Sequence, residues 1–254
     1  MELLDNLNNN FLEKNFIKKI SDKDNPNIYL LKYDKEKSNA DSIAVKQARG
    51  IILENNTNNI VCYSLNKFED NDLIKKEDFD KWEFEEAIDG TQIRLYYYND
   101  EWNVTTARRI LAKNSKWNYV KTFYELFKDV EHMINYEILN KNYTYTFILK
   151  HIENRIISSV KKNELYHIHT RNNKTLEELN EDIGIKKPLK FKFDSYDAFN
   201  EQLNELDFEN KGFVVTYDSK KYMFNTKDYD KVKELKGNHL NINYNFIDLY
   251  RNDK

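Results

Sequence analysis

The stretch that decides the fold is residues 82–106, WEFEEAIDGTQIRLYYYNDEWNVTT. Its first part alternates aromatic or apolar residues with acidic ones, and its middle places Ile93, Leu95 and Tyr97 at every second position. Asn99-Asp100 then turns the chain into another apolar run. Alternation with a period of two is typical of half-buried strands, and Asn and Asp favour tight turns. The stretch therefore predicts strands, including a hairpin.

Strand patterns extend outward from this stretch on both sides. Upstream, residues 29–68 hold short apolar runs separated by Asn-rich turns, and downstream apolar and polar residues alternate again. The further strands are expected at residues 51–53, 60–64, 145–157, 164–170, 213–217 and 221–224. The first two of these and the last two are each expected to pair as a hairpin, the last pair around Asp218-Ser219.

Other segments carry apolar residues at helical spacing. The expected helices span residues 1–24, 117–139, 176–183, 199–206 and 229–235. A polar stretch ends the first of them near Ile28, so residues 1–28 are predicted to be an N-terminal helical segment. No repeat or linker interrupts the chain, and the order of strands and helices predicts one α+β domain.

The composition limits the classes of protein. Of 254 residues 40% are hydrophobic and 33% charged, and the net charge of −3 gives no average support for nucleic-acid binding, although 40 Lys and Arg can still form local patches. No run approaches the ~20 apolar residues of a membrane span. A single cysteine, Cys62, excludes an intramolecular disulfide and suits a reducing cytosol, so we expect a cytoplasmic protein. His167 and His169 lack a Cys partner and are interpreted as structural.

Glycine is scarce, with five residues in the chain. Gly50, Gly90 and Gly212 each open an apolar run, while Asn occupies many turns. These three positions are expected to need a backbone without a side chain, for a positive φ or for the close approach of another group.

The octapeptide AIDGTQIR at residues 87–94 resembles the nucleotide-attachment motif of the RNA ligase 1 family, usually written K-x-D-G-S/T. Further segments resemble the family's other motifs in the family's order. They are ARGII at 48–52, NKF at 66–68, TFI through ENRII at 146–157, the strand at 164–172, KGFVV at 211–215 and MFN through Tyr at 223–229. The resemblance covers roughly residues 29–235. It implies an RNA ligase-like nucleotidyltransferase domain, related to ATP-grasp proteins, with antiparallel sheets flanked by helices.

Five positions depart from the family's pattern where the family places its chemistry. The nucleophilic lysine is Ala87, the strand glutamate is Ile148, and the glutamate of the E-G pair is Lys211. The two lysines of the last motif are Met223 and Asn225. The helical domain that usually follows that motif is reduced to a short tail at residues 236–254.

These departures predict a loss of catalysis. The family's reaction starts when a lysine amine attacks the α-phosphate of ATP, a step that needs a nucleophilic nitrogen and metal-assisted charge neutralisation. The methyl group of Ala87 cannot attack, and Lys211 would repel Mg²⁺. A laboratory Lys→Ala substitution would explain Ala87 alone, so natural loss is the better interpretation. We expect an inactive nucleotidyltransferase with no cofactor and no metal ion.

The basic residues that remain suit a phosphate ligand. The positions expected to bind RNA phosphates are Arg49, Lys67, Arg108, Arg109, Lys113, Arg155 and Lys211. Arg49 and Lys67 match family positions that contact the triphosphate of ATP. Replacing a metal-binding carboxylate by Lys211 converts a cation site into an anion site, which suits direct binding of a phosphate backbone. The glycines above, together with Asp89, are expected to form the framework of the family's cleft.

Purely structural roles stay open as alternatives for several of these residues. Arg49 could pair with an acidic neighbour such as Glu54. The basic run at residues 108–113 could be a solvated start of a helix, and Asp89 with Gly90 could preserve only the turn between strands.

Three functions are compatible with this pattern. The first is a non-catalytic RNA-binding protein that holds short structured or fragment RNA. In an A/T-rich phage, which the excess of Asn, Lys, Ile and Tyr suggests, its purpose would be evasion of host defence. Some anti-CRISPR proteins aimed at type III RNA-guided complexes are similar in spirit, and a host ribonucleoprotein would then be a partner in the host cytoplasm. The second function is a ligase or nucleotidyltransferase with altered catalytic residues, and the third is a protein-interaction module without RNA.

Overall fold

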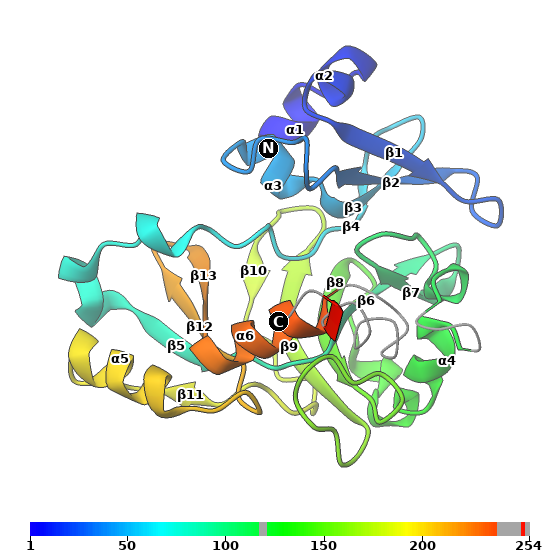
Figure 1. The fold of residues 1–254 in the computed structure, drawn as a ribbon. Coiled ribbons are helices and arrows are strands. Elements are labelled where there is room, and N and C mark those ends of the chain that lie inside the picture. The colour runs from blue at the N-terminus through cyan, green and yellow to red at the C-terminus, as the bar shows by residue number, and fades with distance from the viewer. Residues whose placement is uncertain (117–120, 238–249, 252–254) are drawn as a thin grey trace. The chain divides into compact units, whose positions relative to one another are not determined.

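A computed structural model describes residues 1–116, 121–237 and 250–251 (Figure 1). The chain divides into two compact units that are each assembled from separate segments. Unit 1 comprises Met1–Lys67, Gly90–Asn154 and Lys162–Lys187, and unit 2 comprises Phe68–Asp89, Arg155–Lys161 and Pro188–Lys254. The domain bounds predicted above stay a prediction, since this division records packing alone. Most of the predicted tail at residues 236–254 lies outside the described residues.

Among the described residues the strands form three antiparallel sheets, two in unit 1 and one in unit 2. The first sheet of unit 1 has the order β1-β2-β3-β4. Its strands are β1 (Ile17–Ser21), β2 (Ile28–Tyr33), β3 (Arg49–Glu54) and β4 (Ile60–Cys62). The helices α1 (Glu2–Asp5), α2 (Asn9–Lys14) and α3 (Ile43–Gln47) pack against one of its faces through Leu3, Leu12 and Val45. The predicted β3–β4 hairpin is confirmed.

The prediction of a helical segment over residues 1–28 is wrong in its second half. Helix α2 ends at Lys14, and Phe16 adopts a positive φ of 53° that cannot continue a helix. Residues 17–21 then pair along their whole length with β2. Ile17 and Ile20 have spacing that suits a helix as well as a strand, and the hydrogen-bond partners offered by β2 decide between the two.

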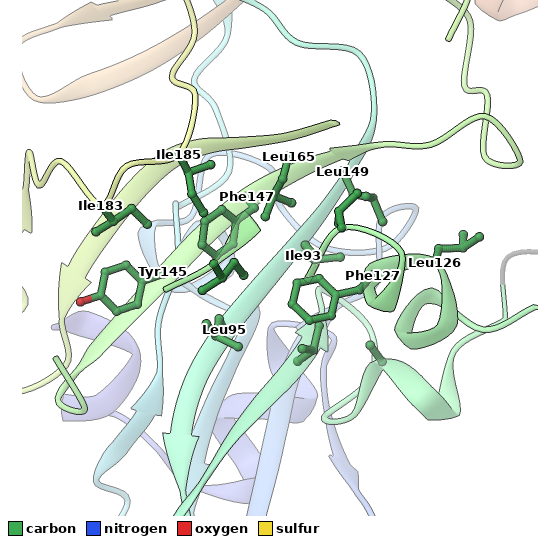
Figure 2. Close-up of a cluster of buried hydrophobic side chains, with 14 of the residues drawn as sticks. Ile93, Leu95, Leu126, Phe127, Tyr145, Phe147, Leu149, Leu165, Ile183 and Ile185 are labelled. Atoms are coloured by element: carbon green, nitrogen blue, oxygen red, sulfur yellow. The ribbon is translucent and has the colours of Figure 1, made fainter. Parts of the chain in front are cut away.

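The second sheet of unit 1 has the order β10-β9-β8-β6-β7. Its strands are β6 (Thr91–Tyr98), β7 (Glu101–Thr106), β8 (Tyr143–Lys150), β9 (Glu164–Asn172) and β10 (Glu178–Leu179). Figure 2 shows the buried apolar side chains of one face, among them Ile93, Leu95 and Phe147, packed with Phe127 of α4 (Phe123–Lys128). The predicted turn at Asn99-Asp100 is confirmed, with positive φ at both residues.

Two predicted helices are wrong or too long in this unit. The segment predicted as a helix over 117–139 contains only α4 and the 3-10 turns η4 (Glu131–Met133) and η5 (Tyr136–Ile138), and residues 117–120 lie outside the described part. Residues 176–183 are not helical, because Leu176 has a φ of 66° and β10 pairs with β9. The strand predicted over 145–157 ends at Lys150.

Unit 2 is built on a sheet with the order β11-β5-β12-β13. Its strands are β5 (Glu83–Glu86), β11 (Lys190–Phe191), β12 (Gly212–Tyr217) and β13 (Lys220–Asn225). An aromatic core that includes Trp82, Phe84 and Phe213 packs against Phe199 of α5 (Tyr196–Glu205). Thr226 caps α6 (Lys227–Lys236) by accepting the N–H of Tyr229.

The 3-10 turns not yet named are η1 (Asn71–Leu73) and η2 (Lys76–Lys81) in unit 2 and η3 (Ala112–Asn114) in unit 1. The late hairpin and the last two helices confirm the sequence prediction.

Gly50, Gly90 and Gly212 lie where a side chain would collide with the backbone. Gly212 has a φ of 122°, and a Cβ there would overlap the carbonyl oxygen of Phe224 on the paired strand. Gly50 has a φ of 82°, and a Cβ at Gly90 would lie 2.6 Å from the carbonyl oxygen of Leu149. The expectation for all three positions is confirmed. Within the described residues no helix has the length and apolar character needed to cross a membrane.

Candidate functional site

Four of the five positions that depart from the ligase pattern meet at one end of the unit 2 sheet. Ala87 follows β5 and donates its backbone N–H to the carbonyl of Gly212 at 2.9 Å. Gly212 is paired across the β12–β13 ladder with Asn225, and Met223 lies two residues earlier on the same strand. Lys211 directly precedes Gly212, and its carbonyl accepts the N–H of Thr226. Strand pairing thus brings these positions together although the sequence separates them.

Ala87 offers no amine at the position where the family has its nucleophilic lysine. Ala87 is 3% exposed, so its methyl group is packed into the unit. The amide of Asn225 donates to Asp230 of α6 at 2.7 Å, and the carbonyl of Met223 accepts from the amide of Asn71. Both residues therefore take part in hydrogen bonds within unit 2.

Asp89, two residues after Ala87, is buried and fully engaged within unit 2. One carboxylate oxygen accepts the backbone N–H groups of Ile157 and Ser158 at 2.8 and 2.9 Å. The other accepts the hydroxyl of Tyr229 at 2.6 Å. Burial, helped by the Asp89 carboxylate, raises the pKa of the Tyr229 hydroxyl, which therefore stays a donor. These contacts favour a structural role for Asp89, tying together β5, residues 155–161 and α6.

Lys236, near the end of α6, approaches the same network. Its ammonium donates to the carbonyl oxygens of Arg155, at 3.1 Å, and of Ile156. Burial lowers the pKa of Lys236, while Asp89 opposes and Arg155 adds to that effect. Arg155 itself is exposed, and its Nε donates to the carbonyl of Ile157 at 2.9 Å.

In unit 1, Arg49 and Lys67 are both half-buried. Arg49 begins β3 and donates to the carbonyl of Asn66 at 3.1 Å, one residue before Lys67. Burial lowers the pKa of Arg49. Glu54 lies at the opposite end of β3 and accepts hydrogen bonds from Thr57 and Asn59. The hydrogen bond of Arg49 to Asn66 brings the two matched positions close together in space although the sequence separates them.

The basic run after β7 begins as a tight turn, and the 3-10 turn η3 starts only at Ala112, so the alternative of a solvated helix start is wrong for Arg108 and Arg109. Thr106 donates its backbone N–H to the carbonyl of Arg109 at 3.3 Å, and the hydroxyl of Thr105 donates to the same oxygen at 2.6 Å. Arg108 and Arg109 are both exposed on this turn. Lys113 lies in η3 and pairs with Asp24 at 2.8 Å, so its charge is partly compensated.

Two basic residues near this turn, Lys18 and Lys32, were not singled out from the sequence. Lys32 of β2 is the cross-strand partner of Arg49 on one side and of Lys18 on the other. Burial lowers the pKa of Lys32, and Arg109, Arg108 and Lys18 lower it further. No local run of charge in the sequence marks this grouping, because Lys18, Lys32 and the turn that carries the two arginines come from three separate segments of the chain.

Ile148, the fifth departure, lies on β8 in unit 1, paired with Gln92 of β6 and Tyr166 of β9. The neighbouring polar side chains hydrogen-bond to one another: Gln92 donates to Ser64 at 3.0 Å, and Ser64 contacts Thr146 at 2.8 Å. Hydroxyl and amide groups thus lie beside the strand position at which the family places glutamate, and the hydroxyl of Tyr166 donates to the carboxylate of Glu164 at 3.3 Å.

The histidines give no sign of a metal centre. His167 packs against Tyr145 and Phe147, and burial lowers its pKa to about 4. In the part of the chain that the structure describes, no group of three or more His, Cys, Asp or Glu side chains could hold a metal ion.

Comparison with known proteins identifies the fold. No family model matches the chain. It is 26% identical over 211 residues to a putative bifunctional polynucleotide kinase/RNA ligase of Autographa californica nuclear polyhedrosis virus, covering 74% of this chain and 30% of that protein. It is 33% identical over 84 residues to the immediate-early protein ICP-46 homolog of Invertebrate iridescent virus 6, covering 27% of this chain and 18% of that protein.

Solved structures give the same result. An archaeal ATP-dependent RNA ligase matches with a TM-score of 0.61 and 10% identity, over 91% of this chain and 63% of that one. A putative ATP-dependent DNA ligase from Aquifex aeolicus matches with a TM-score of 0.57 and 14% identity, over 92% of this chain and 63% of that one. The chain thus spans less than two thirds of the length of these relatives. Its fold is that of the nucleotidyltransferase domains of ATP-dependent RNA and DNA ligases, as the motifs predicted.

Proposed function

We propose that this chain, built on an RNA ligase-like nucleotidyltransferase fold, binds RNA without joining it. The observation that carries the proposal is the buried methyl group of Ala87, held by its hydrogen bond to Gly212 at the position where the resemblance places the nucleophilic lysine. Formation of a lysyl–AMP adduct requires an amine at that point. Lys211, Met223 and Asn225 around it remove the other groups expected to act on ATP or its metal ion.

The charges of these positions support a phosphate ligand. Lys211 carries a positive charge where a metal-binding carboxylate is expected, so the local charge suits an anion. Arg108, Arg109 and Arg155 are exposed and can reach a backbone phosphate. Arginine binds phosphate in a bidentate geometry, which strengthens such contacts.

Protein purified from the producing cell under low salt is expected to carry RNA. The ultraviolet absorbance spectrum should show nucleic acid that ribonuclease removes and deoxyribonuclease does not, and the stripped protein should shift short structured RNAs in a gel. The affinity should fall as salt rises, because phosphate contacts release counterions. An RNA-free preparation that also fails to shift RNA would contradict the proposal and favour a protein-interaction module.

We further propose that the RNA-bound protein serves viral counter-defence against a type III ribonucleoprotein. The viral origin of both curated relatives supports this, and so does the excess of Asn, Lys, Ile and Tyr, which suggests an A/T-rich coding genome. Adding the protein to a purified type III complex should block cleavage of its target RNA. Undiminished cleavage at an excess of the protein would overturn this part of the proposal.

An altered nucleotidyltransferase is the alternative function, and Lys236 is the observation that favours it. Its amine is half-buried, has a lowered pKa and lies near Asp89 within unit 2. A lowered pKa is typical of nucleophilic lysines. Its donation to two carbonyl oxygens argues for a structural role.

Incubation with α-labelled ATP and Mg²⁺ or Mn²⁺ separates the two functions. We expect no labelled protein, no label on RNA and no release of pyrophosphate. The variant Ala87→Lys should also stay unlabelled, because the groups that would neutralise the α-phosphate are still missing. Labelling of the unaltered protein that disappears in Lys236→Ala would instead establish the alternative.

A further inference from the structure

Four basic side chains of unit 1, which we call the basic cluster, come from three segments of the chain. They are Lys18, Lys32, Arg108 and Arg109. Lys18 and Lys32 are directly opposite each other on β1 and β2. Side chains of opposite residues lie on the same face of a sheet, with Cβ atoms about 5 Å apart. The two ammonium groups are therefore neighbours.

The turn that carries the two arginines packs on that same face. Lys32 shares its face of β2 with Leu30 and Ile28, two and four residues earlier. Both are buried together with Ile110, which directly follows Arg109. Apolar packing of Ile110 and the hydrogen bonds of Thr105 and Thr106 to the carbonyl of Arg109 fix the backbone of the turn. The sheet face thus carries two lysines beside a rigid turn with two exposed arginines.

The charges of the cluster oppose one another in the free protein. Burial lowers the pKa of Lys32, and the charged groups that lower it further are Arg109, Arg108 and Lys18. Asp34 pairs with Lys18 at 3.3 Å and compensates part of the charge at the exposed edge. Like charges held this close destabilise the fold unless an anion joins them.

We propose that the basic cluster binds consecutive phosphates of an RNA backbone, with Arg108 and Arg109 contacting the phosphates and Lys18 and Lys32 neutralising them from the sheet. The inference rests on the proposed function and locates the RNA on the first sheet of unit 1, where Lys32 is the cross-strand partner of Arg49. A regular series of phosphates matches paired guanidinium groups better than scattered carboxylates do, because each guanidinium can bind two phosphate oxygens. An acidic protein segment is the competing ligand.

The test compares variants of the cluster with a matched control, using a short fluorescein-labelled single-stranded RNA over a range of salt. The double variant Arg108→Ala/Arg109→Ala should weaken binding at least about tenfold and reduce the slope of log affinity against log salt by about 1.4. Lys32→Met should weaken binding about threefold to tenfold. The control Lys141→Ala/Lys162→Ala removes the same charge from exposed positions, and Lys141 lies over Tyr97 at the far end of the β6–β7 hairpin. It should bind within about twofold of the unaltered protein.

Thermal unfolding distinguishes binding from structural support. Since the folded protein disfavours the charged form of Lys32, the Lys32→Met variant without RNA should keep its melting temperature or gain roughly 1–3 °C. A role in holding the fold would lower it. Reduced RNA binding by a variant at least as stable as the parent supports the inference.

The possible failures are separable. If the unaltered protein binds RNA and the cluster variants bind as it does, the inference is overturned and the proposed function stands. If the unaltered protein binds no RNA, both fail. If poly-glutamate binds to the cluster and RNA does not, the ligand is an acidic protein segment, and the RNA inference is overturned.

Discussion

Replacing Asp89 by alanine is expected to lower the free energy of unfolding by about 3–5 kcal/mol, because three buried hydrogen-bond donors lose their acceptor. The backbone N–H groups of Ile157 and Ser158 and the hydroxyl of Tyr229 all donate to this carboxylate. Asp89 is 6% exposed, so water cannot readily replace it. An effect of this size would explain why a motif aspartate is kept in a chain whose motif lysine is gone.

Denaturant unfolding of the purified variants measures this effect. Tyr229→Phe is the matched control, since it removes one hydroxyl and should cost about 1 kcal/mol. Asp89→Asn keeps the shape but turns an amide toward some of the donors, so an intermediate loss is expected. A loss below about 1 kcal/mol in Asp89→Ala would show that the network contributes little.

The second large effect is expected from Arg94→Ala in unit 1, which should lower the free energy of unfolding by about 4 kcal/mol. Arg94 is 1% exposed, and its guanidinium donates to the carbonyl oxygens of Gly50, at 2.6 Å, and of Thr106. Burial lowers its pKa. The substitution leaves a cavity and two buried carbonyl groups without these donors.

Loss of Arg94 should also weaken RNA binding, since Gly50 follows Arg49 and Thr106 begins the turn of Arg108 and Arg109. Unfolding curves and RNA titrations on the same preparation test both effects, below the melting temperature of the variant. Arg94→Lys keeps a charge with fewer and differently placed donors, and should lose about half as much stability. Unchanged stability in Arg94→Ala would contradict the role assigned to these hydrogen bonds.

Local patterns in the sequence predicted the hairpins because alternation and turn residues act over a few positions. The turns at Asn99-Asp100 and Asp218-Ser219 are examples, and both have positive φ in the structure. Residues 17–21 and 176–183 were predicted wrongly, since short apolar segments fit a helix or a strand equally well. Pairing with β2 and with β9 decided these segments, and no local pattern reveals such pairing.

In the candidate site, too, some features follow from the sequence and others only from the tertiary structure. The sequence by itself determined which chemical groups are present, since an alanine and an isoleucine cannot act as a nucleophile or metal ligand in any conformation, and a methionine carries no charge that could neutralise a phosphate. It also placed three glycines where only the smallest residue fits.

Only the tertiary structure decided what the remaining polar residues do. In the sequence Asp89 is recognisable only as a motif residue. Its hydrogen-bond donors Ile157 and Tyr229 lie 68 and 140 positions away along the chain. Lys18 and Lys32 face the arginine turn because strand register and the burial of Ile110 bring them there. Charge interacts through space, so a cluster assembled from distant strands has no signature along the chain.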